Sequence, residues 1–373
     1  MQEPGEIIPA YAPGIALSSL AWAGKFLASG ASRQQRKEHE HVPLLLTQDD
    51  LRPLLEGPDF FASVFQVIRE ALLAQHSTTL GHLSWLSFPL GDETRRFNIN
   101  ALSTPLDGTS IRVFPVSGGD IHPEANGFFA LLLDNQDGRL QALIATDDLS
   151  PLRTSAPVGL ASAYLARPGS TTLGMLGSGL QAQEHLRAIA AAMPSLATVL
   201  VFSPTTEHCN AYATRMSAQT GLAVKAVSSA REVVEGADII CIAANGRGPA
   251  LEASWIRPGA LLISITGQGL PPDLTTRVVV PALAGPAIRS SGWDPRPVMA
   301  TTGGRDPSTI ATTLLEVICG SGLPRVSGDE IILYEQRGSY AWDAAILRWV
   351  YTWAVEHQAG TSFQLSSPPL HEV

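Results

Sequence analysis

The spacing of hydrophobic and polar positions changes along the chain and predicts which elements follow one another. Residues 1–42 hold one short apolar run and a charged stretch, and we interpret them as an N-terminal extension. Apolar residues at helical spacing fill 60–76, and Thr47 with Asp50 ahead of them resembles a capping box. Residues 80–146 alternate and contain the turn sequence DNQDG, which predicts an antiparallel sheet.

A helix is predicted directly after this sheet, with Ser150 as its N-cap, Pro151 in its first turn and Gly169 beyond its end. Beyond it, apolar strands alternate with helices, which is typical of a parallel sheet with helices on both faces. The chain then ends in a long amphipathic helix over 338–358, whose tryptophans we expect in a core or an interface. The pattern as a whole predicts an α/β fold.

The sequence LGSGLQAQ joins the first strand of the parallel sheet to the helix that follows. Its Gly177, Gly179 and Ala182 match the pattern Gly-x-Gly-x-x-Ala in the strand–turn–helix context of a dinucleotide site. Gly177 permits the tight turn, Gly179 lets the backbone approach a pyrophosphate, and Ala182 lets the helix pack closely. The free N–H groups at the helix start favour the phosphates, and this context disfavours the alternative of a purely structural turn.

The predicted cofactor contacts lie in the glycine turn and at the ends of neighbouring strands. They are Gly177, Ser178, Gly179, Leu180, Gln181, Ala182, Ser203, Thr205, Ala243, Ala244 and Thr266. An NAD site usually carries an acid about 20 residues beyond the glycines, on the ribose. Here the second strand ends in small hydroxyl residues, with no acid before Glu207 and no arginine close behind. We therefore expect NADP or NAD and favour NADP.

Composition and charge limit the classes of protein that fit. The chain has 373 residues, which is enough for two domains, and its net charge of -9 disfavours nucleic acid or an anionic membrane as a partner. Three separated cysteines without a CxxC spacing, and an N-terminus with acids and prolines, favour a cytoplasmic protein. His39-Glu40-His41 lies in a charged stretch, which we interpret as a solvated linker, and we expect no metal site.

Several segments together resemble the ornithine cyclodeaminase/mu-crystallin family. They are LGSGLQAQ, LRTSAPVGLASAYL, EGADIICIAA, WIRPGALLISITG and QRGSYAWDAA, and the resemblance covers about 44–370. It implies a Rossmann domain at 151–335 inserted in a substrate-binding and dimerisation domain made of 43–150 and 336–373. It also implies a homodimer, and hydride transfer between nicotinamide and the α-carbon of an amino or imino acid.

The resemblance also assigns residues to the substrate. Arg153, in the family's Arg-Thr motif, would bind the substrate carboxylate, for which a guanidinium is suited, and Thr154 would touch the cofactor. Arg112 stands where the family has a lysine near the reacting carbon, and we assign it to catalysis and substrate binding together with Arg153. A further family arginine falls at Trp85, and Arg96 on the next strand is a candidate replacement.

The largest departure from the family lies in the segment ITGQGLPPDL. Cyclodeaminases carry an Asp and then a Glu there, and the matching positions are Gly269 and Thr275, with Asp273 nearby. Cyclodeamination needs several proton transfers, whereas a single hydride step to a protonated imine needs fewer. We therefore favour an imine reductase or amino acid dehydrogenase. The alternatives are a cyclodeaminase-like ammonia lyase, a synthase that couples amino acids, and a non-catalytic binder of NADP or a small ligand like mu-crystallin.

Overall fold

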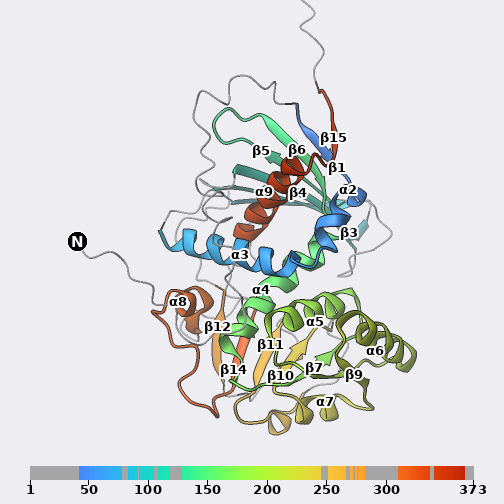
Figure 1. Ribbon diagram of the computed structural model, residues 1–373, viewed down its shortest axis with the longest axis vertical. Helices are drawn as coiled ribbons and strands as arrows, with labels where there is room; N and C mark the ends of the chain where they lie inside the picture. Colours follow the sequence, from blue (N-terminus) through green and yellow to red (C-terminus); the bar gives the residue numbers. More distant parts are fainter. Residues whose placement is uncertain are drawn as a thin grey trace, which may run out of the picture.

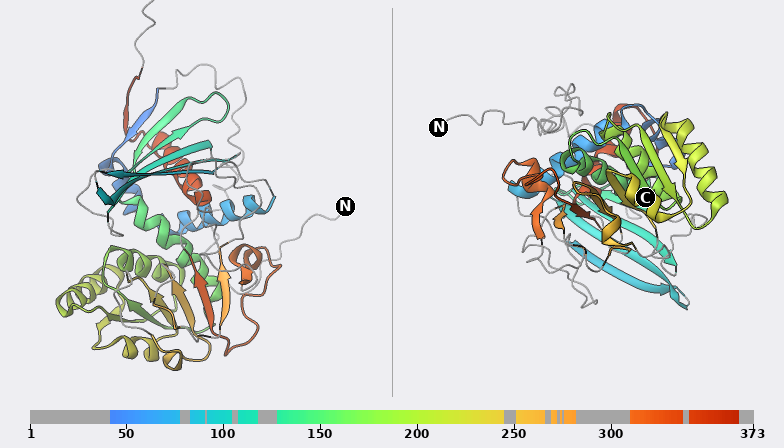
Figure 2. Two further views of the ribbon diagram at one scale, coloured as in Figure 1. Left: turned by 180° about the vertical axis from the view of Figure 1, so that it is seen from behind. Right: turned by 90° about the horizontal axis from the view of Figure 1, so that it is seen from below.

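The computed structural model describes residues 42–77, 83–90, 92–104, 108–117, 128–244, 251–265, 269–271, 274, 276–281, 310–336 and 340–365. Within these ranges the strands form two sheets, which lie one above the other with helix α4 (Leu149–Leu165) between them (Figure 1). The view from behind shows the same two layers (Figure 2). None of the helices in these ranges is long and apolar enough to cross a membrane.

The first sheet has seven strands among the described residues, in the order β15-β1-β6-β5-β4-β3-β2. Strands β2 to β6 run antiparallel to one another, as the alternation predicts, whereas β1 pairs with β6 in parallel. The strands are β1 (Leu44–Leu46), β2 (Leu83–Leu90), β3 (Asp92–Thr104), β4 (Gly108–Ser117), β5 (Phe129–Leu133), β6 (Leu140–Ala145) and β15 (Thr361–Ser362). The DNQDG turn between β5 and β6 is confirmed.

Helices pack beneath this sheet because every second side chain of its strands points toward them. Ala130, Leu132 and Ile144 point to the inner face and are fully buried, with helix α9 (Tyr340–Glu356) packed on that side. Helix α3 (Phe60–Ser77) packs on α9, and α2 (Gln48–Leu55) starts at the predicted Thr47–Asp50 capping box, which is confirmed. Trp342 and Trp349 of α9 are buried, in keeping with a core role.

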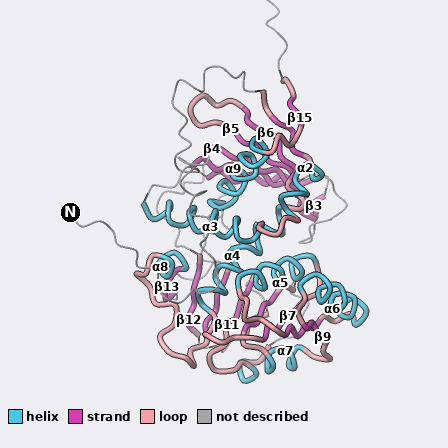
Figure 3. The backbone as a smooth tube through the Cα atoms, in the orientation of Figure 1, coloured by secondary structure: helices cyan, strands magenta, loops and turns pink. Residues whose placement is uncertain are grey.

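The second sheet is parallel and has eight strands in the described ranges, in the order β13-β12-β14-β11-β10-β7-β8-β9. They are β7 (Thr172–Leu176), β8 (Thr198–Phe202), β9 (Ala223–Ala226), β10 (Ile239–Ile242), β11 (Leu261–Ser264), β12 (Arg277–Val280), β13 (Ile310–Thr313) and β14 (Ile332–Glu335). Figure 3 shows α5 (Leu180–Ala192) and α6 (Thr206–Thr220) on one side of these strands and α7 (Ala230–Gly236) on the other. A short 3-10 turn, Ala253–Trp255, and α8 (Leu314–Ile318) complete the layer. The predicted α/β fold with a doubly covered parallel sheet is confirmed.

Helix α4 joins the two sheets and is buried along most of its length. Its N-cap is Asp148, so the prediction of Ser150 as N-cap is wrong. The backbone of Asp148 is already helical, and the Ser150 N–H donates to the Thr146 carbonyl, so the helix begins before the serine. At Gly159 an added Cβ would lie 2.6 Å from the Ala188 carbonyl oxygen, which shows how closely α4 approaches α5.

Candidate functional site

The glycine turn between β7 and α5 requires its first glycine for two reasons. Gly177 has φ +119°, in the region that disfavours side chains, and its N–H donates to the Phe202 carbonyl at 2.9 Å. A Cβ at this position would lie 2.7 Å from the carbonyl oxygen of Ala243, which follows β10. The turn after β7 therefore lies directly against the turn after β10.

The second glycine leaves the start of helix α5 open. Gly179 is the N-cap, without a side-chain hydrogen bond to the helix, and a Cβ there would meet no atom within 4 Å. Leu180 beside it is 53% exposed, whereas Ala182 is fully buried and its carbonyl accepts a hydrogen bond from Tyr212. The first N–H groups of this helix thus face open space, which is the geometry that binds phosphate groups.

The other predicted cofactor residues lie at the carboxyl ends of adjacent strands, where ligands of such sheets bind. Ala243 and Ala244 follow β10 and are half-buried, and β10 neighbours β7 on one side. Ser203 and Thr205 follow β8, the neighbour on the other side, and Thr205 is the N-cap of α6. Thr266 lies outside the described residues. The structure thus brings the three strand ends together at one edge.

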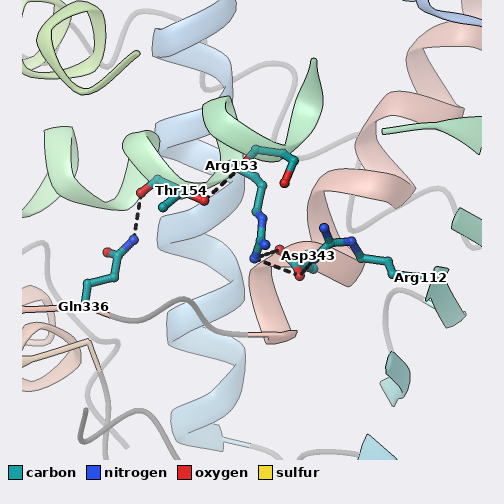
Figure 4. A network of polar contacts seen from close by, with 6 residues as sticks. Arg112, Arg153, Thr154, Gln336 and Asp343 are labelled. Carbon is teal, nitrogen blue, oxygen red and sulfur yellow. Dashed lines mark hydrogen bonds and ion pairs between the residues drawn. The ribbon is translucent and has the colours of Figure 1, made fainter. Parts of the chain in front are cut away.

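Two predicted substrate residues meet at a carboxylate that the sequence prediction missed (Figure 4). Arg112 extends from β4 and Arg153 from the first turns of α4, and both bind Asp343 of α9. Nη1 of Arg153 donates to both oxygens of Asp343, at 3.0 and 3.1 Å, and Nη1 of Arg112 donates to Oδ2. The sequence does carry a signal for Asp343, because it is an acid within the largely apolar run YAWDAAILRWV.

The three charged side chains of this arrangement are largely buried. The side chains of Arg112 and Asp343 are 6% and 3% exposed, and that of Arg153 is 20% exposed. The three groups carry a net charge of +1, and a buried charge requires a partner. Nε of Arg153 is buried and has no hydrogen-bond partner among the described residues. Arg153 is thus a cation with one buried N–H donor that can bind a further carboxylate.

The hollow beside these residues is narrow. Leu149, Ile346 and Leu347 line it together with the two arginines and Asp343, and its volume is about 10 Å³. This space holds about one water molecule. A larger ligand must therefore reach Arg153 from another direction or widen this hollow.

Hydrogen bonds connect the arginine site to the parallel sheet. The side chain of Gln336, directly after β14, donates to the Thr154 carbonyl at 2.7 Å and accepts a hydrogen bond from Tyr334 at 3.1 Å. The hydroxyl of Thr154 donates to the Ser150 carbonyl at 2.9 Å within α4. Gln336 thereby fixes the start of α4, and with it Arg153, to the edge where the glycine turn lies.

The remaining predicted substrate residues lie on the first sheet. Trp85 of β2 pairs with Asn100, which in turn pairs with Arg112, so the three positions share one row. Arg96 lies four residues from Asn100 on β3, about 13 Å along the strand, and its side chain is outside the described part of the chain. The register thus puts Arg96 well away from the Arg112 row.

Two titratable groups of α5 are shifted by burial. Desolvation raises the pKa of Glu184, although Arg187 donates to it at 2.8 Å. Burial lowers the pKa of His185 to about 4, and its Nδ1 lies 2.7 Å from the Gln181 carbonyl oxygen, to which it donates. His185 is therefore neutral at pH 7 and belongs to the packing between helices.

Comparisons with known proteins identify the family to which the chain is similar. Residues 122–358 match the ornithine cyclodeaminase/mu-crystallin family. A Δ1-pyrroline-2-carboxylate reductase of Paracoccus denitrificans is 28% identical over 194 residues, 52% of this chain and 56% of that protein. The ketimine reductase mu-crystallin of Rattus norvegicus is 32% identical over 130 residues, 35% of this chain and 40% of that protein.

A solved structure extends the similarity over most of the chain. The Δ1-pyrroline-2-carboxylate reductase of Thermococcus litoralis, in complex with NADH and L-proline, is 25% identical with a TM-score of 0.70. The match covers 86% of this chain and 100% of that one. The predicted Rossmann fold, combined with a second sheet, is confirmed by this similarity.

Proposed function

The chain belongs to the ornithine cyclodeaminase/mu-crystallin family, and from that premise we propose that it is a nicotinamide-dependent oxidoreductase. It transfers hydride to or from the α-carbon of an imino or amino acid. Residues 151–335 form the cofactor domain, and residues 43–150 with 336–373 form the substrate domain. The observation that carries the proposal is the buried Nε of Arg153, which has no partner among the described residues and lies on the helix that Gln336 ties to the cofactor edge.

The glycine turn fits a dinucleotide. Gly177 and Gly179 leave a cradle that a Cβ would fill or strain, and the open start of α5 binds the pyrophosphate. Leu180 and Ala243 lie beside this cradle. When bound, the nicotinamide supplies or accepts the hydride. NADP is the preferred cofactor, because Ser203 and Thr205 leave room for its 2′-phosphate; NADPH should then have the lower KM than NADH.

Arg153 binds the substrate carboxylate through a charge-assisted hydrogen bond from Nε. Asp343 holds Nη1 of Arg153 and so fixes the direction of the guanidinium. Arg112 is a positioning residue that holds Asp343 from the sheet. This division of roles follows from burial, because Arg153 is the more exposed of the two arginines.

A single hydride step fits better than cyclodeamination. Gly269, at the position of the family Asp, has φ +77° and is exposed, so its backbone favours glycine over a side chain that could transfer protons. Asp273 and Thr275 lie outside the described residues. A protonated imine is already electrophilic and needs chiefly orientation and exclusion of competing groups.

Oxidation of NADPH and NADH in the presence of cyclic and acyclic imino acids tests this function. Arg153→Ala should lower kcat/KM by about 1.5 to 3.5 decades, because a charge-assisted contact of about 2–5 kcal/mol is lost. Arg187→Ala, on α5 and outside the site, is the matched control. Arg112→Lys should retain part of the activity that Arg112→Ala loses. Parent-like turnover by both alanine variants would contradict the carboxylate site.

The first sheet also supports the homodimer. Its outer face carries the half-buried apolar side chains of Ile99, Ile111, Leu131 and Leu143, opposite the face on which α9 packs. A second copy of the chain covers this face in the proposed dimer. Light scattering should give twice the chain mass for the parent, and Leu131→Asp should shift the protein toward the monomer. A monomeric parent would contradict the dimer.

A further inference from the structure

Strand β3 carries two buried asparagines that lack hydrogen bonds where they would be expected. Asn98 and Asn100 are 7% and 4% exposed. The Oδ1 atom of each is buried and has no hydrogen-bond partner among the described residues. Buried amide oxygens are nearly always paired, because leaving one unpaired is unfavourable. Two such oxygens on one strand need a common explanation.

Their position relative to the arginine site provides one. Asn100 pairs directly with Arg112 across the β3–β4 ladder, and Asn98 pairs with Phe114. Residues two apart on a strand share a face, so both asparagines lie on the inner face with Arg112. Directly opposed side chains have Cβ atoms about 5 Å apart. Helix α9, which carries Asp343, packs against β3 and β4 on this face.

Three buried atoms that lack a partner within the described part of the chain are chemically complementary to one kind of ligand. Nε of Arg153 is a donor for a carboxylate, and the two amide oxygens are acceptors for N–H or O–H groups. The α-nitrogen of a protonated cyclic imine has a single N–H. Asn98 and Asn100 are two residues apart, about 6.7 Å along the strand, so one N–H cannot serve both.

We propose that Asn98 and Asn100 form an acceptor site for the substrate side chain. The substrate then belongs to the imino or amino acids whose side chain carries an amide, hydroxyl or ammonium donor. This inference rests on the proposed function for the carboxylate end of the ligand. An apolar side chain of the same shape would leave the amide oxygens unpaired, so the site discriminates between the two roughly 10- to 100-fold.

Isosteric pairs of free amino acids test the acceptor site directly. The pairs are asparagine and leucine, homoserine and norvaline, and ornithine and norleucine. In each pair, methyl groups in the second amino acid replace the polar end of the first. Calorimetry on the whole protein with saturating NADP⁺ gives the affinity, and NADPH formation gives kcat/KM. In at least one pair, the donor-bearing member should bind and react about 10- to 100-fold better than its isostere.

Substitutions of the two asparagines test whether these residues cause the preference. At least one of Asn98→Leu and Asn100→Leu should reduce the preference within the favoured pair at least about fivefold, because a single donor reaches only one of the two oxygens. Thr104→Val is the matched control, because Thr104 is a buried polar residue on the same face of β3, and it should leave the preference unchanged. If Asn100→Gln keeps more of the preference than Asn100→Leu, the preference depends on hydrogen bonding rather than on packing.

The outcomes separate this inference from the proposed function. Turnover of amino acids with equal affinity within every pair would overturn the acceptor site and leave the oxidoreductase function standing. Selective binding of a donor-bearing ligand without any turnover would support the acceptor site and contradict the function. Leucine variants that keep the parent's preference would overturn the assignment of the two asparagines, whatever the parent selects.

Discussion

Replacing Asp343 by asparagine removes the buried carboxylate that lies between two arginines. Asparagine has almost the same volume, so packing is kept while the negative charge is lost. Breaking a buried ion pair by removing one partner costs about 3–5 kcal/mol, since the other charge stays buried. Arg112 is 6% exposed and bears this cost, whereas Arg153, at 20%, can partly turn to water. We therefore expect a loss near the lower value, about 3 kcal/mol.

A loss of this size is measurable, because domains are stable by only about 5–15 kcal/mol. Urea titration at fixed pH and protein concentration, followed by tryptophan fluorescence, gives the free energy of unfolding. The double variant with Arg112→Met and Asp343→Leu should recover most of the loss, since it replaces the pair with apolar groups of similar volume. Together with the single variants Arg112→Met and Asp343→Leu, the double variant forms a double-mutant cycle that isolates the coupling between the two side chains.

Added carboxylate provides a second, chemically specific readout. In Asp343→Asn, Arg153 loses the carboxylate that its Nη1 binds, so acetate should raise the unfolding midpoint of this variant more than that of the parent. Sodium chloride at equal ionic strength is the control for general screening. If Asp343→Asn unfolds within about 1 kcal/mol of the parent, or acetate has the same effect on both proteins, Asp343 does not balance the arginines as described.

Three further predictions address the cofactor turn, acid stability and reaction type. Gly179→Trp should abolish NADPH binding in calorimetry while circular dichroism stays unchanged, because a side chain there enters the open cradle; unchanged affinity would count against the turn as the site. His185 is neutral in the fold with a pKa of about 4, so the unfolded chain binds the extra proton first below pH 6.5. The parent should therefore lose about 3 kcal/mol of stability from this group as pH falls from 6.5 to 4, a slope that His185→Leu lacks in urea titrations. Equal slopes of stability against pH for the parent and for His185→Leu would refute this prediction. Ornithine should release little or no ammonia, and Gly269→Asp should not restore release because φ is +77°; an ammonia assay showing rates like imine reduction would reverse this conclusion.

Local patterns in the sequence predicted the local elements well. The Thr47–Asp50 capping box, the DNQDG hairpin and the strand–turn–helix around Gly177 each depend on residues within a few positions. Such features follow from backbone preferences that a short segment carries by itself. The start of α4 was missed because Asp148 takes helical dihedrals without a capping side-chain bond.

The composition of the arginine site could not be predicted in the same way. Alternation along a strand places Arg112 on the face opposite to that of Ile111 and Val113, but it does not say which face is buried. The structure shows Arg112 on the inner face, against a carboxylate from the last helix. The asparagines of the segment FNINAL occupy the same inner positions, and their burial follows from the packing of α9. Only the tertiary arrangement reveals these contacts.

The pairing of Asp343 with residues far ahead of it has a consequence for how the protein folds. Asp343 follows Arg112 by 231 positions and Arg153 by 190. Both arginines therefore leave the ribosome long before the acid that balances them is made. The strands of the parallel sheet are contiguous in sequence and close shorter loops, so they can associate first, whereas docking of α9 closes a much longer loop and comes late. We expect the ligand site to be completed in the last folding step, and a nascent chain that stops before α9 to expose two unbalanced cations to chaperones and other anionic surfaces.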